Sequence, residues 1–575
     1  MIMANQFNSY SIRVPKKNHF KLDHSVKFTG NMGEIIPVLV QDVLPNDTFE
    51  LSLQSLIRFA PLQAPMMSEV DVYFHAFFVP ERIIWTAAPD FFTGAHNGVK
   101  LSASEIPARP SLSFKGTQAQ KLAQNPPDGQ FNDIYGMLQN GSLADYLGFQ
   151  SMQVNELNDS NEAEVHLDQM PFRAYLRIWY DYYMDENLVE SSIGLTDFIE
   201  SLWDTSGDME VTQSLSARAH SLMALRRRAW RKDYFTSALP WPQKGDDVLI
   251  PAGGTDKDYV NVTVNPNNVD GWFNIPNQQF PTGSVTARGN GGDSGSLYVD
   301  SQPFGLNIFK LGVNPQQLGI SQGTIRDLRR AYAAQAFLER RAVGGSRYQE
   351  QNLAFFGIKG SDARLQRSEF LGGIKNPVIV SQLLQTSETS STSPQGTPSG
   401  NAVSAGNGFI FKKTFEEYGY IMVLMSVMPK ADYMTGTPRM YLRKDVYDFY
   451  FPQFAHIGEQ AIQNQEIYTN YSSLGYGSNE NASELSLNEG TFGYTPRYAE
   501  YRFRNNRVCG DFKGNLNFWT LGRSFDSIPQ LNMSFIECNP SNRVFAVLDQ
   551  NTDHLWAEVA FRLRALRPVV KYAES

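Results

Sequence analysis

Segments with the pattern of β-strands lie at both ends of this 575-residue chain, and a different kind of sequence lies between them. Residues 34–43, 49–59 and 70–79 are short apolar or alternating runs, and the last of them is rich in β-branched and aromatic residues. Strand-like runs return only after residue 410. If all these runs share one sheet system, the two ends of the chain must pair across a long sequence separation. Sandwiches and jelly rolls do this, whereas sequential βαβ folds do not.

The last third of the chain carries the matching strand-like runs. They are expected at residues 419–428, 497–504, 511–521, 543–548 and 555–566. The longest apolar stretch, Tyr420 to Met428, is far short of the roughly 20 residues that a membrane-spanning helix needs. Aromatic residues make up 13% of the chain, and such rings fill β-cores and anchor interfaces. We therefore expect a mainly β protein, an antiparallel sandwich or barrel with insertions. Because no apolar signal segment follows the N-terminus, we expect it to fold in a cytoplasm.

The middle of the chain predicts helices. Residues 171–188 have Pro at a plausible first helical position and apolar residues at helical spacing. Residues 324–343 give the clearest helix, because Thr324 with Asp327 resembles a capping pair and two glycines follow the last residue. Arginines flank this second helix. The face that we expect to pack is formed by Ile325, Leu328, Tyr332 and Gln335.

Two stretches have the composition of long surface loops. Residues 246–320 are rich in Gly and Asn and carry seven Asp and no Glu, against three basic residues. Loops of this length are usually functional. Residues 386–408 are rich in Ser, Thr and Gly and are expected to be flexible. The expected parts are a basic N-terminal arm (1–32), a jelly-roll domain with helical insertions (33–245 plus 321–575), a surface insertion (246–320) and the flexible loop (386–408).

Residue patterns that carry enzymatic chemistry are absent from the sequence. No Gly-Lys dipeptide is present to build a Walker A loop, no HExxH motif occurs, and the eight histidines lack metal-ligand spacing. Residues 292–295 (GDSG) match the nucleophile tetrapeptide of trypsin-like proteases, but they lie in the Gly-rich insertion, and we interpret them as a surface turn. Two cysteines cannot form a disulfide framework. We expect no enzymatic activity, no cofactor and no metal site.

The net charge is −9, yet basic residues gather in three places. The N-terminal cluster contains Arg13, Lys16, Lys17, Lys21 and Lys27. The central cluster contains Arg226, Arg227, Arg228, Arg231 and Lys232. The last cluster contains Arg562, Arg564, Arg567 and Lys571. Local basic patches on an acidic protein suggest two faces with different partners, although each cluster taken alone could be a solvated surface.

Several blocks of the sequence carry a specific resemblance to a known family. They include residues 58–85 (RFAPLQAPMMSEVDVYFHAFFVPERIIW), 171–188, 227–245 (RRAWRKDYFTSALPWPQKG), 324–350, 361–373 (SDARLQRSEFLGG), 419–430 (GYIMVLMSVMPK), 450–460 and 492–512. In order and extent, these blocks resemble the major capsid protein of microviruses, the small icosahedral single-stranded DNA phages, and especially its gokushovirus branch. That family commonly has Pro where Ser368 stands. Residues 246–320 and 386–408 match no pattern of the family.

The resemblance implies both a fold and a set of partners. The family fold is an eight-stranded viral jelly roll with long insertions, assembled as a T=1 icosahedral shell in the virion. The implied partners are other copies of the chain, a single-stranded DNA genome, an internal scaffolding protein, a DNA pilot protein, a small DNA-binding protein and a host receptor. In the gokushovirus branch a large insertion projects at the threefold axes. By position and composition, residues 246–320 are the candidate for that projection.

Candidate functional residues follow from charge and from the resemblance together. Basic residues that face a genome neutralise phosphates by releasing counterions, and the candidates are Arg13, Lys16, Lys17, Lys21, Arg226, Arg227 and Arg228. Salt bridges between subunits are an equal alternative for the last three. The receptor-facing candidates are Asp270, Trp272, Phe273, Asp293 and Tyr298. The alternative function, from another class, is a ring-forming jelly-roll carbohydrate-binding protein, because exposed aromatics and Asn/Asp-rich loops suit sugars.

Overall fold

The computed structural model describes residues 16–97, 99–115, 138–151, 164–188, 195–211, 221–246, 285–288, 296–299, 302–303, 325–345, 347–358, 360–363, 365–384, 398–455, 458–471, 487–547 and 552–571. Contacts divide the chain into two compact units, Met1–Pro242 with Arg341–Ser575, and Gln243–Arg340. In its described residues, the second unit holds three short antiparallel strands and most of one long helix. These are β11 (Val285–Arg288), β12 (Ser296–Val299), β13 (Gln302–Pro303) and α9 (Ile325–Val343).

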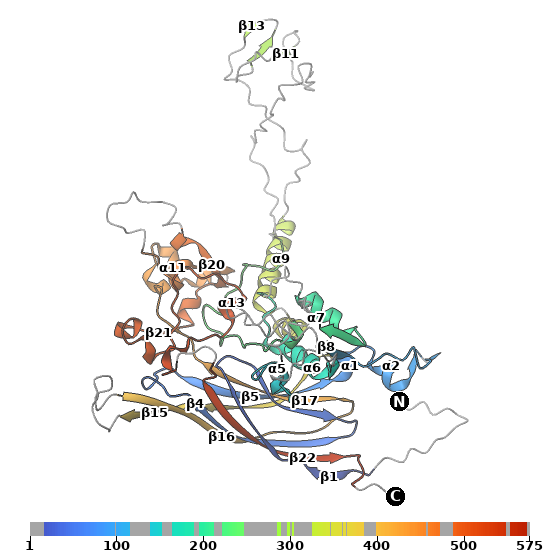
Figure 1. The fold of residues 1–575 in the computed structure, drawn as a ribbon. Helices are drawn as coiled ribbons and strands as arrows, with labels where there is room; N and C mark the ends of the chain where they lie inside the picture. The colour runs from blue at the N-terminus through green and yellow to red at the C-terminus, as the bar shows by residue number, and fades with distance from the viewer. Residues whose placement is uncertain are drawn as a thin grey trace. The chain divides into compact units, whose positions relative to one another are not determined.

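The first unit is built on two facing antiparallel sheets (Figure 1). The larger sheet has six strands in the order β1-β22-β4-β16-β15, with β2 also paired to β22. Its strands are β1 (Asn18–Lys21), β2 (His24–Gly30), β4 (Thr48–Phe59), β15 (Ile379–Leu384), β16 (Pro398–Thr414) and β22 (Leu555–Arg567). The pairing of β4 with β22 runs from Phe59↔Leu555 to Thr48↔Leu566. The two ends of the chain therefore do pair in one sheet, as the strand pattern predicts.

The smaller sheet has four strands in the order β14-β5-β17-β3. They are β3 (Ile36–Val43), β5 (Val70–Pro80), β14 (Glu369–Pro377) and β17 (Gly419–Pro429). Between the two sheets lies the main core, to which β4 and β22 contribute residues such as Leu53 and Phe561, and β5 and β17 residues such as Phe74 and Val423. The fold is thus a mainly β antiparallel sandwich, consistent with a jelly roll.

The two sheets differ in how many of their faces are covered, and the sequence reflects this. Every residue of β17 is buried, because a second core covers the outer face of the smaller sheet. In β22, buried and more exposed residues alternate from Leu555 to Leu566, because only one face of the larger sheet meets the core. Continuous apolar strands belong to sheets covered on both faces, and alternating strands to sheets with one open face. The larger sheet therefore has an open face.

Helices of the first insertions cover the smaller sheet (Figure 1). They are α1 (Glu81–Ile84), α2 (Ala88–Thr93), α5 (Leu143–Tyr146), α6 (Met170–Ile178), the π-helix η3 (Trp179–Tyr183) and α7 (Leu195–Trp203). Rings of Phe172, Tyr175 and Trp179 pack there with Phe77 and Met422 of the sheet. No helix among the described residues is both long and apolar enough to cross a membrane.

Short elements complete the described part of the first unit. The strands are β6 (Ala95–His96), β7 (Val99–Lys100), β8 (Ser111–Lys115), β9 (Glu164–Asp168), β10 (Asp208–Val211), β18 (Asp432–Tyr433), β19 (Glu459–Gln463), β20 (Thr491–Pro496) and β21 (Asn506–Arg507). The helices are α10 (Tyr348–Phe356), α11 (Asn464–Ile467) and α13 (Met533–Ile536). The 3-10 turns are η6 (Arg439–Tyr441), η7 (Val446–Asp448), η8 (Pro452–Phe454), η10 (Ala499–Tyr501), η11 (Gly510–Lys513), η12 (Asn517–Trp519) and η13 (Asn542–Val544).

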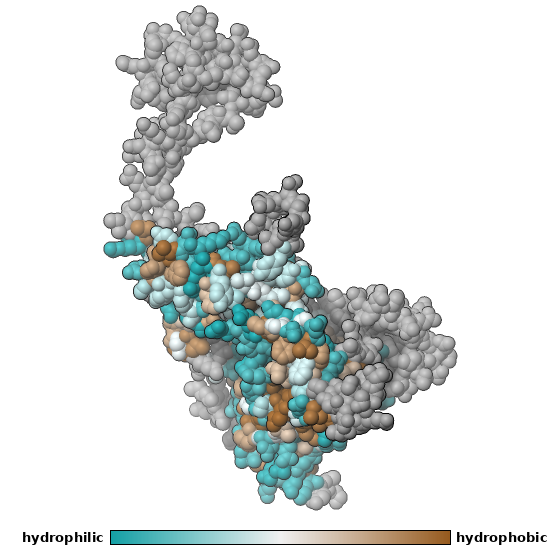
Figure 2. Space-filling view, turned by 90° about the vertical axis from the view of Figure 1, so that its left-hand side faces the viewer, coloured by the Kyte–Doolittle hydropathy of each residue, from teal (hydrophilic) through white to brown (hydrophobic). Residues whose placement is uncertain are grey.

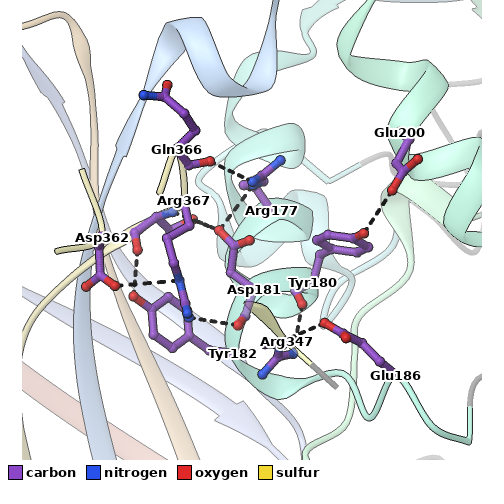
Figure 3. A network of polar contacts seen from close by, with 11 residues as sticks. Arg177, Tyr180, Asp181, Tyr182, Glu186, Glu200, Arg347, Asp362, Gln366 and Arg367 are labelled. Atoms are coloured by element: carbon purple, nitrogen blue, oxygen red, sulfur yellow. Dashed lines mark hydrogen bonds and ion pairs between the residues drawn. The ribbon is translucent and has the colours of Figure 1, made fainter. Parts of the chain in front are cut away.

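A polar network fixes η3 to residues on both sides of α10, Arg347 before it and Ser368 after it (Figure 3). One carboxylate oxygen of Asp181, whose side chain is 6% exposed, accepts hydrogen bonds from Arg177 Nε at 3.1 Å and from Ser368. The backbone N–H of Ser368 donates at 2.7 Å and its hydroxyl at 2.8 Å. Arg347 donates to the carbonyl oxygen of Tyr180 at 3.0 Å. Proline, which the resemblance implies at position 368, could make neither hydrogen bond to Asp181.

Several local expectations differ from the structure. The predicted strands at 497–504, 511–521 and 543–548 are mainly 3-10 turns and coil. Residues 18–30, expected in the N-terminal arm, form β1 and β2 because their apolar side chains reach the main core. Residues 398–408, expected in the flexible loop, form the first part of β16, where they pair with β15 and β4.

The prediction of which face of α9 packs is also wrong in part. Leu328 and Tyr332 are exposed. The helix itself, Ile325–Val343, matches the predicted span within one residue. Helical periodicity predicts which residues share a face, but it does not say whether that face is covered.

Candidate nucleic-acid interface

The open face of the larger sheet carries a set of basic side chains. In β22 the sequence Phe-Arg-Leu-Arg places Phe561 and Leu563 in the core and turns Arg562 and Arg564 outward. Alternate side chains of a strand stand about 7 Å apart on the same face. The face, called the basic face below, comprises the cations Lys21, Lys27, Arg58, Lys412, Arg562 and Arg564, together with the carboxylates Glu50 and Glu558.

Strand register brings these charges into rows across the sheet. Lys21 of β1 pairs with Arg564 of β22, which pairs with Glu50 of β4, which in turn pairs with Lys412 of β16. In a second row, Arg562 of β22 pairs with Ser52 of β4, which pairs with Phe409 of β16. Neighbouring strands lie about 4.8 Å apart. Residues from the first 60 and the last 20 positions of the chain therefore form one continuous charged surface.

The cations of the basic face fall into two groups. Lys27 lies 3.5 Å from Glu558 and Lys412 lies 3.1 Å from Glu50, so each of these lysines has a carboxylate partner. The other cations make no ion pair or hydrogen bond within the described residues. These four free cations are Lys21, Arg58, Arg562 and Arg564. Exposed cations without a carboxylate partner are available to phosphate.

Exposed aromatic rings stand among the free cations. Trp556 pairs across the sheet with Arg58, and Phe409 of β16 pairs with Ser52, which also pairs with Arg562. Both rings are exposed. A β-bulge lies between Phe409 and Phe411, the latter buried in the core. Cations that neutralise a backbone and rings on which bases stack are the elements of a surface for single-stranded nucleic acid.

The predicted DNA-facing residues of the N-terminal arm reach this surface in part. Lys21 is one of the free cations of the basic face. Lys16 is exposed, and Lys17 donates to the hydroxyl of Thr48 at 3.3 Å. Arg13 lies outside the described residues. Of the predicted arm residues, Lys21 therefore has the clearest place in a basic surface.

The arginine cluster 226–228 lies instead beside the helices that cover the smaller sheet, which are called the insertion layer below. Arg226 stacks over Trp179, with its guanidinium carbon 4.6 Å from the ring centroid, and burial lowers its pKa. Arg227 lies 3.2 Å from Glu34. Arg228 donates to the hydroxyl of Ser426 at 3.0 Å and stacks over Tyr73 at 4.5 Å. These contacts within the chain leave the three arginines few free donors for phosphate, so their DNA contact stays a prediction without support from the geometry.

Arg228 also acts on a histidine beside it. His75 of β5 shares a hydrogen bond of 2.7 Å with the hydroxyl of Tyr183. Burial, and secondarily the positive charge of Arg228, lower the pKa of His75 to about 4. Because the pKa in the unfolded chain is near 6.5, this histidine stabilises the fold above pH 6.5 and the contribution is lost as the pH falls toward 4.

We expect acid to weaken the first unit partly through this histidine. Between pH 7 and pH 4.5 the loss attributable to His75 should be at most about 3 kcal/mol. In His75→Phe, which cannot take up a proton, the decline should be shallower, although the lost hydrogen bond to Tyr183 lowers stability at every pH. Urea unfolding of the unassembled subunit at several pH values measures both slopes. Parallel slopes would refute the assignment.

The predicted receptor-facing residues lie almost wholly outside the described part of the chain. Asp270, Trp272, Phe273 and Asp293 are outside it. Tyr298 is in β12, where its backbone pairs with Thr286 of β11 and Pro303 of β13. Among the residues that the structure does describe, no three His, Cys, Asp or Glu side chains gather in a way that could hold a metal ion.

Arg562, Arg564 and Arg58 were not among the candidate DNA contacts from the sequence. For Arg562 and Arg564 the signal was the strand alternation at residues 561–564, in which each arginine follows a buried apolar residue. Arg58 follows the buried Ile57 of β4 in the same way. Clustering along the sequence favoured Arg226–Arg228 instead. The register between strands decides which side chains lie together on a sheet surface. This register cannot be inferred from which residues are adjacent in sequence.

Comparisons with known proteins identify the relatives of this chain. A family model described as "Capsid protein (F protein)" matches residues 10–575. The protein named capsid protein VP1 of Chlamydia phage 1 is 32% identical, over all of this chain and 97% of that protein. The proteins of the same name from Bdellovibrio phage phiMH2K and Spiroplasma virus 4 are 29% and 28% identical, covering 98% and 94% of their lengths.

Proposed function

This chain belongs to the phage capsid protein (F protein) family, and on that premise we propose that it forms a T=1 icosahedral shell around a single-stranded DNA genome. The family is one of structural capsid proteins and not of enzymes. Self-association into a capsid and a place in the phage virion follow from membership. The carbohydrate-binding alternative has no comparable support.

The observation that carries the DNA part of the proposal is the basic face. Four free cations and two exposed rings stand on one open sheet of a protein whose net charge is −9. The opposite face of that sheet packs on the main core, so these charges face away from the subunit and can meet another molecule. We propose that this face lines the interior of the shell and contacts the genome.

Electron microscopy and nuclease digestion test the proposed function together. The full chain, produced with the other structural proteins of its phage, should yield uniform icosahedral particles that protect single-stranded DNA from nuclease. A reconstruction should contain 60 copies if the shell is T=1. Open rings, or closed shells that protect no DNA, would contradict the proposal. The implied scaffolding, DNA pilot and small DNA-binding proteins would be tested by omitting each in turn.

We further propose that residues 246–320 attach the particle to its host. The support is the acidic, Gly- and Asn-rich composition and the position of the insertion in the family resemblance. Deleting residues 250–318 should leave shell assembly intact and reduce adsorption to host cells at least tenfold. Particle counts by microscopy and adsorption assays measure the two effects separately. An insoluble or unassembled product would count against an independent insertion, and normal adsorption would count against host attachment.

A further inference from the structure

A second surface, dense in aromatic rings and arginines, lies on residues 439–455 and 497–507. We call it the aromatic–arginine surface. The backbone of its first segment has only the turns η6, η7 and η8, joined by coil. Its rings that are at least half exposed are Tyr441, Tyr447, Phe449, Tyr450, Tyr501 and Phe503. Figure 2 shows the side of the molecule on which β15, β21 and α11 lie in Figure 1, and hydrophobic side chains gather there in groups among hydrophilic ones.

The rings of this surface are held in place by the chain itself. Tyr498 is buried, and its hydroxyl donates to the carbonyl oxygen of Phe449 at 3.0 Å. Its ring packs edge-on against Tyr450, with centroids 5.1 Å apart. Tyr498 adopts a left-handed backbone conformation (φ 61°), which is unfavourable for a residue with a side chain. Rings fixed before binding lose little entropy when a partner covers them.

The arginines beneath the rings are already engaged inside the subunit. Arg443, whose side chain is 15% exposed, lies 4.0 Å from Glu500 and stacks over Phe449 and Tyr501. Arg439 pairs with the buried Glu466 at 3.0 Å. Arg497 stacks over Tyr498. These three cations support rings and do not point at a ligand. Arg504 and Arg507 of the same surface are exposed and make no ion pair among the described residues, so they are available to an acidic partner. Fixed aromatic rings with arginines among them are typical of the centre of a protein contact.

The exposed apolar area is large for a surface without a partner. Six rings that each offer roughly 200 Å², half exposed or more, present on the order of 600 Å², the upper end for the largest patch of a monomeric protein. A stable protein contact buries about 800 Å² on each side, with Tyr, Trp and Arg at its centre. We propose that the aromatic–arginine surface is a contact between neighbouring copies of this chain. The inference rests on the proposed shell and assigns one of its contacts.

Charge indicates which kind of symmetry axis this contact serves. The two segments carry seven basic and three acidic residues. In a twofold contact the surface would meet itself, and like charges would face each other. In a ring contact it meets a different surface of the neighbour, and the chain's overall charge of −9 makes an acidic one available. The aromatic–arginine surface is therefore assigned to a ring-forming contact.

Substitution of two exposed rings tests the contact. Tyr447 is 67% exposed and Phe503 is 58% exposed, so Tyr447→Ser with Phe503→Ser should leave the subunit folded. Under conditions in which the unchanged chain forms shells, the double variant should need at least tenfold more protein to assemble. Sedimentation velocity measures assembly, and circular dichroism of the unassembled subunit measures folding. Tyr471→Ser is the matched control, because Tyr471 is also 67% exposed and lies outside the surface.

Each other outcome has a defined meaning. Normal assembly of the double variant overturns the proposal, as does an equal loss in Tyr471→Ser. Normal shells with less DNA would also overturn it and make the surface a nucleic-acid contact. If the double variant does not fold, hydroxyl-radical labelling of unchanged protein decides. Tyr447 and Phe503 should react at least fivefold less in shells than in dissociated subunits, and equal reaction overturns the contact. Failure of the unchanged chain to form any shell would contradict the proposed function instead.

Discussion

Neutralising the four free cations of the basic face should remove most of the salt dependence of DNA binding. The variant carries Lys21→Gln, Arg58→Gln, Arg562→Gln and Arg564→Gln. Each phosphate contact on a single strand contributes about 0.7 to the slope of log affinity against log salt, so the slope should fall by about 3. Between 50 and 200 mM salt, the unchanged subunit should then lose about 50-fold more affinity than the variant. Fluorescence anisotropy with a single-stranded oligonucleotide measures both slopes.

A charge-matched variant shows whether the effect belongs to this face. Four exposed arginines of α9, namely Arg326, Arg329, Arg330 and Arg341, can be changed to Gln with the same loss of charge. Their removal should change the slope by less than about 1. The basic-face variant should also assemble into shells that contain at least tenfold less nuclease-protected DNA. An equal slope change in the α9 variant, or full DNA content in the basic-face variant, would refute the assignment.

The general plan of the fold could be predicted because the number of buried faces of a strand determines whether its residues are continuously apolar or alternate with polar ones. The continuous apolar run at residues 420–428 became β17, buried on both faces, and the alternating run at 555–566 became β22, with one open face. Strands with weaker patterns were missed. β16 begins in a Gly-, Ser- and Asn-rich stretch, where the small side chains let Asn376 and Ile374 of β14 approach closely at Gly406 and Gly408.

The failures have a physical cause as well. Residues 497–504 (RYAEYRFR) mix aromatic and charged side chains, a pattern that favours a strand, yet the mixture here serves arginine stacking on rings around a 3-10 turn. Arg227 and Arg228 find partners 193 and 198 positions away in sequence, at Glu34 and Ser426. A cluster of like charges reveals nothing about such distant partners. The basic face was hidden for the same reason, since its rows depend on the register of strands from both ends of the chain.

The largest loss of folding stability is expected from Asp181. Its carboxylate is buried and accepts three hydrogen bonds, from Arg177 and from the backbone and hydroxyl of Ser368 (Figure 3). Removing one member of a buried ion pair leaves the other charge uncompensated, at a cost of about 3–5 kcal/mol. Asp181→Ala should therefore lower the free energy of unfolding by that amount, a large share of the roughly 5–15 kcal/mol available to a typical domain. Urea unfolding of the unassembled subunit measures the loss.

Graded variants separate the buried carboxylate from surface charge in general. Ser368→Ala removes one of the three hydrogen bonds and should cost about 1–2 kcal/mol. Glu489→Gln breaks the pair with Lys444, in which both side chains are exposed, and should lower stability far less than either change in the buried network, because solvent screens exposed pairs. If Asp181→Ala costs no more than Glu489→Gln, the network in Figure 3 does not stabilise the fold. The expected order instead places the strongest restraint of the insertion layer where η3 meets Ser368, in a contact that a proline at position 368 could not make.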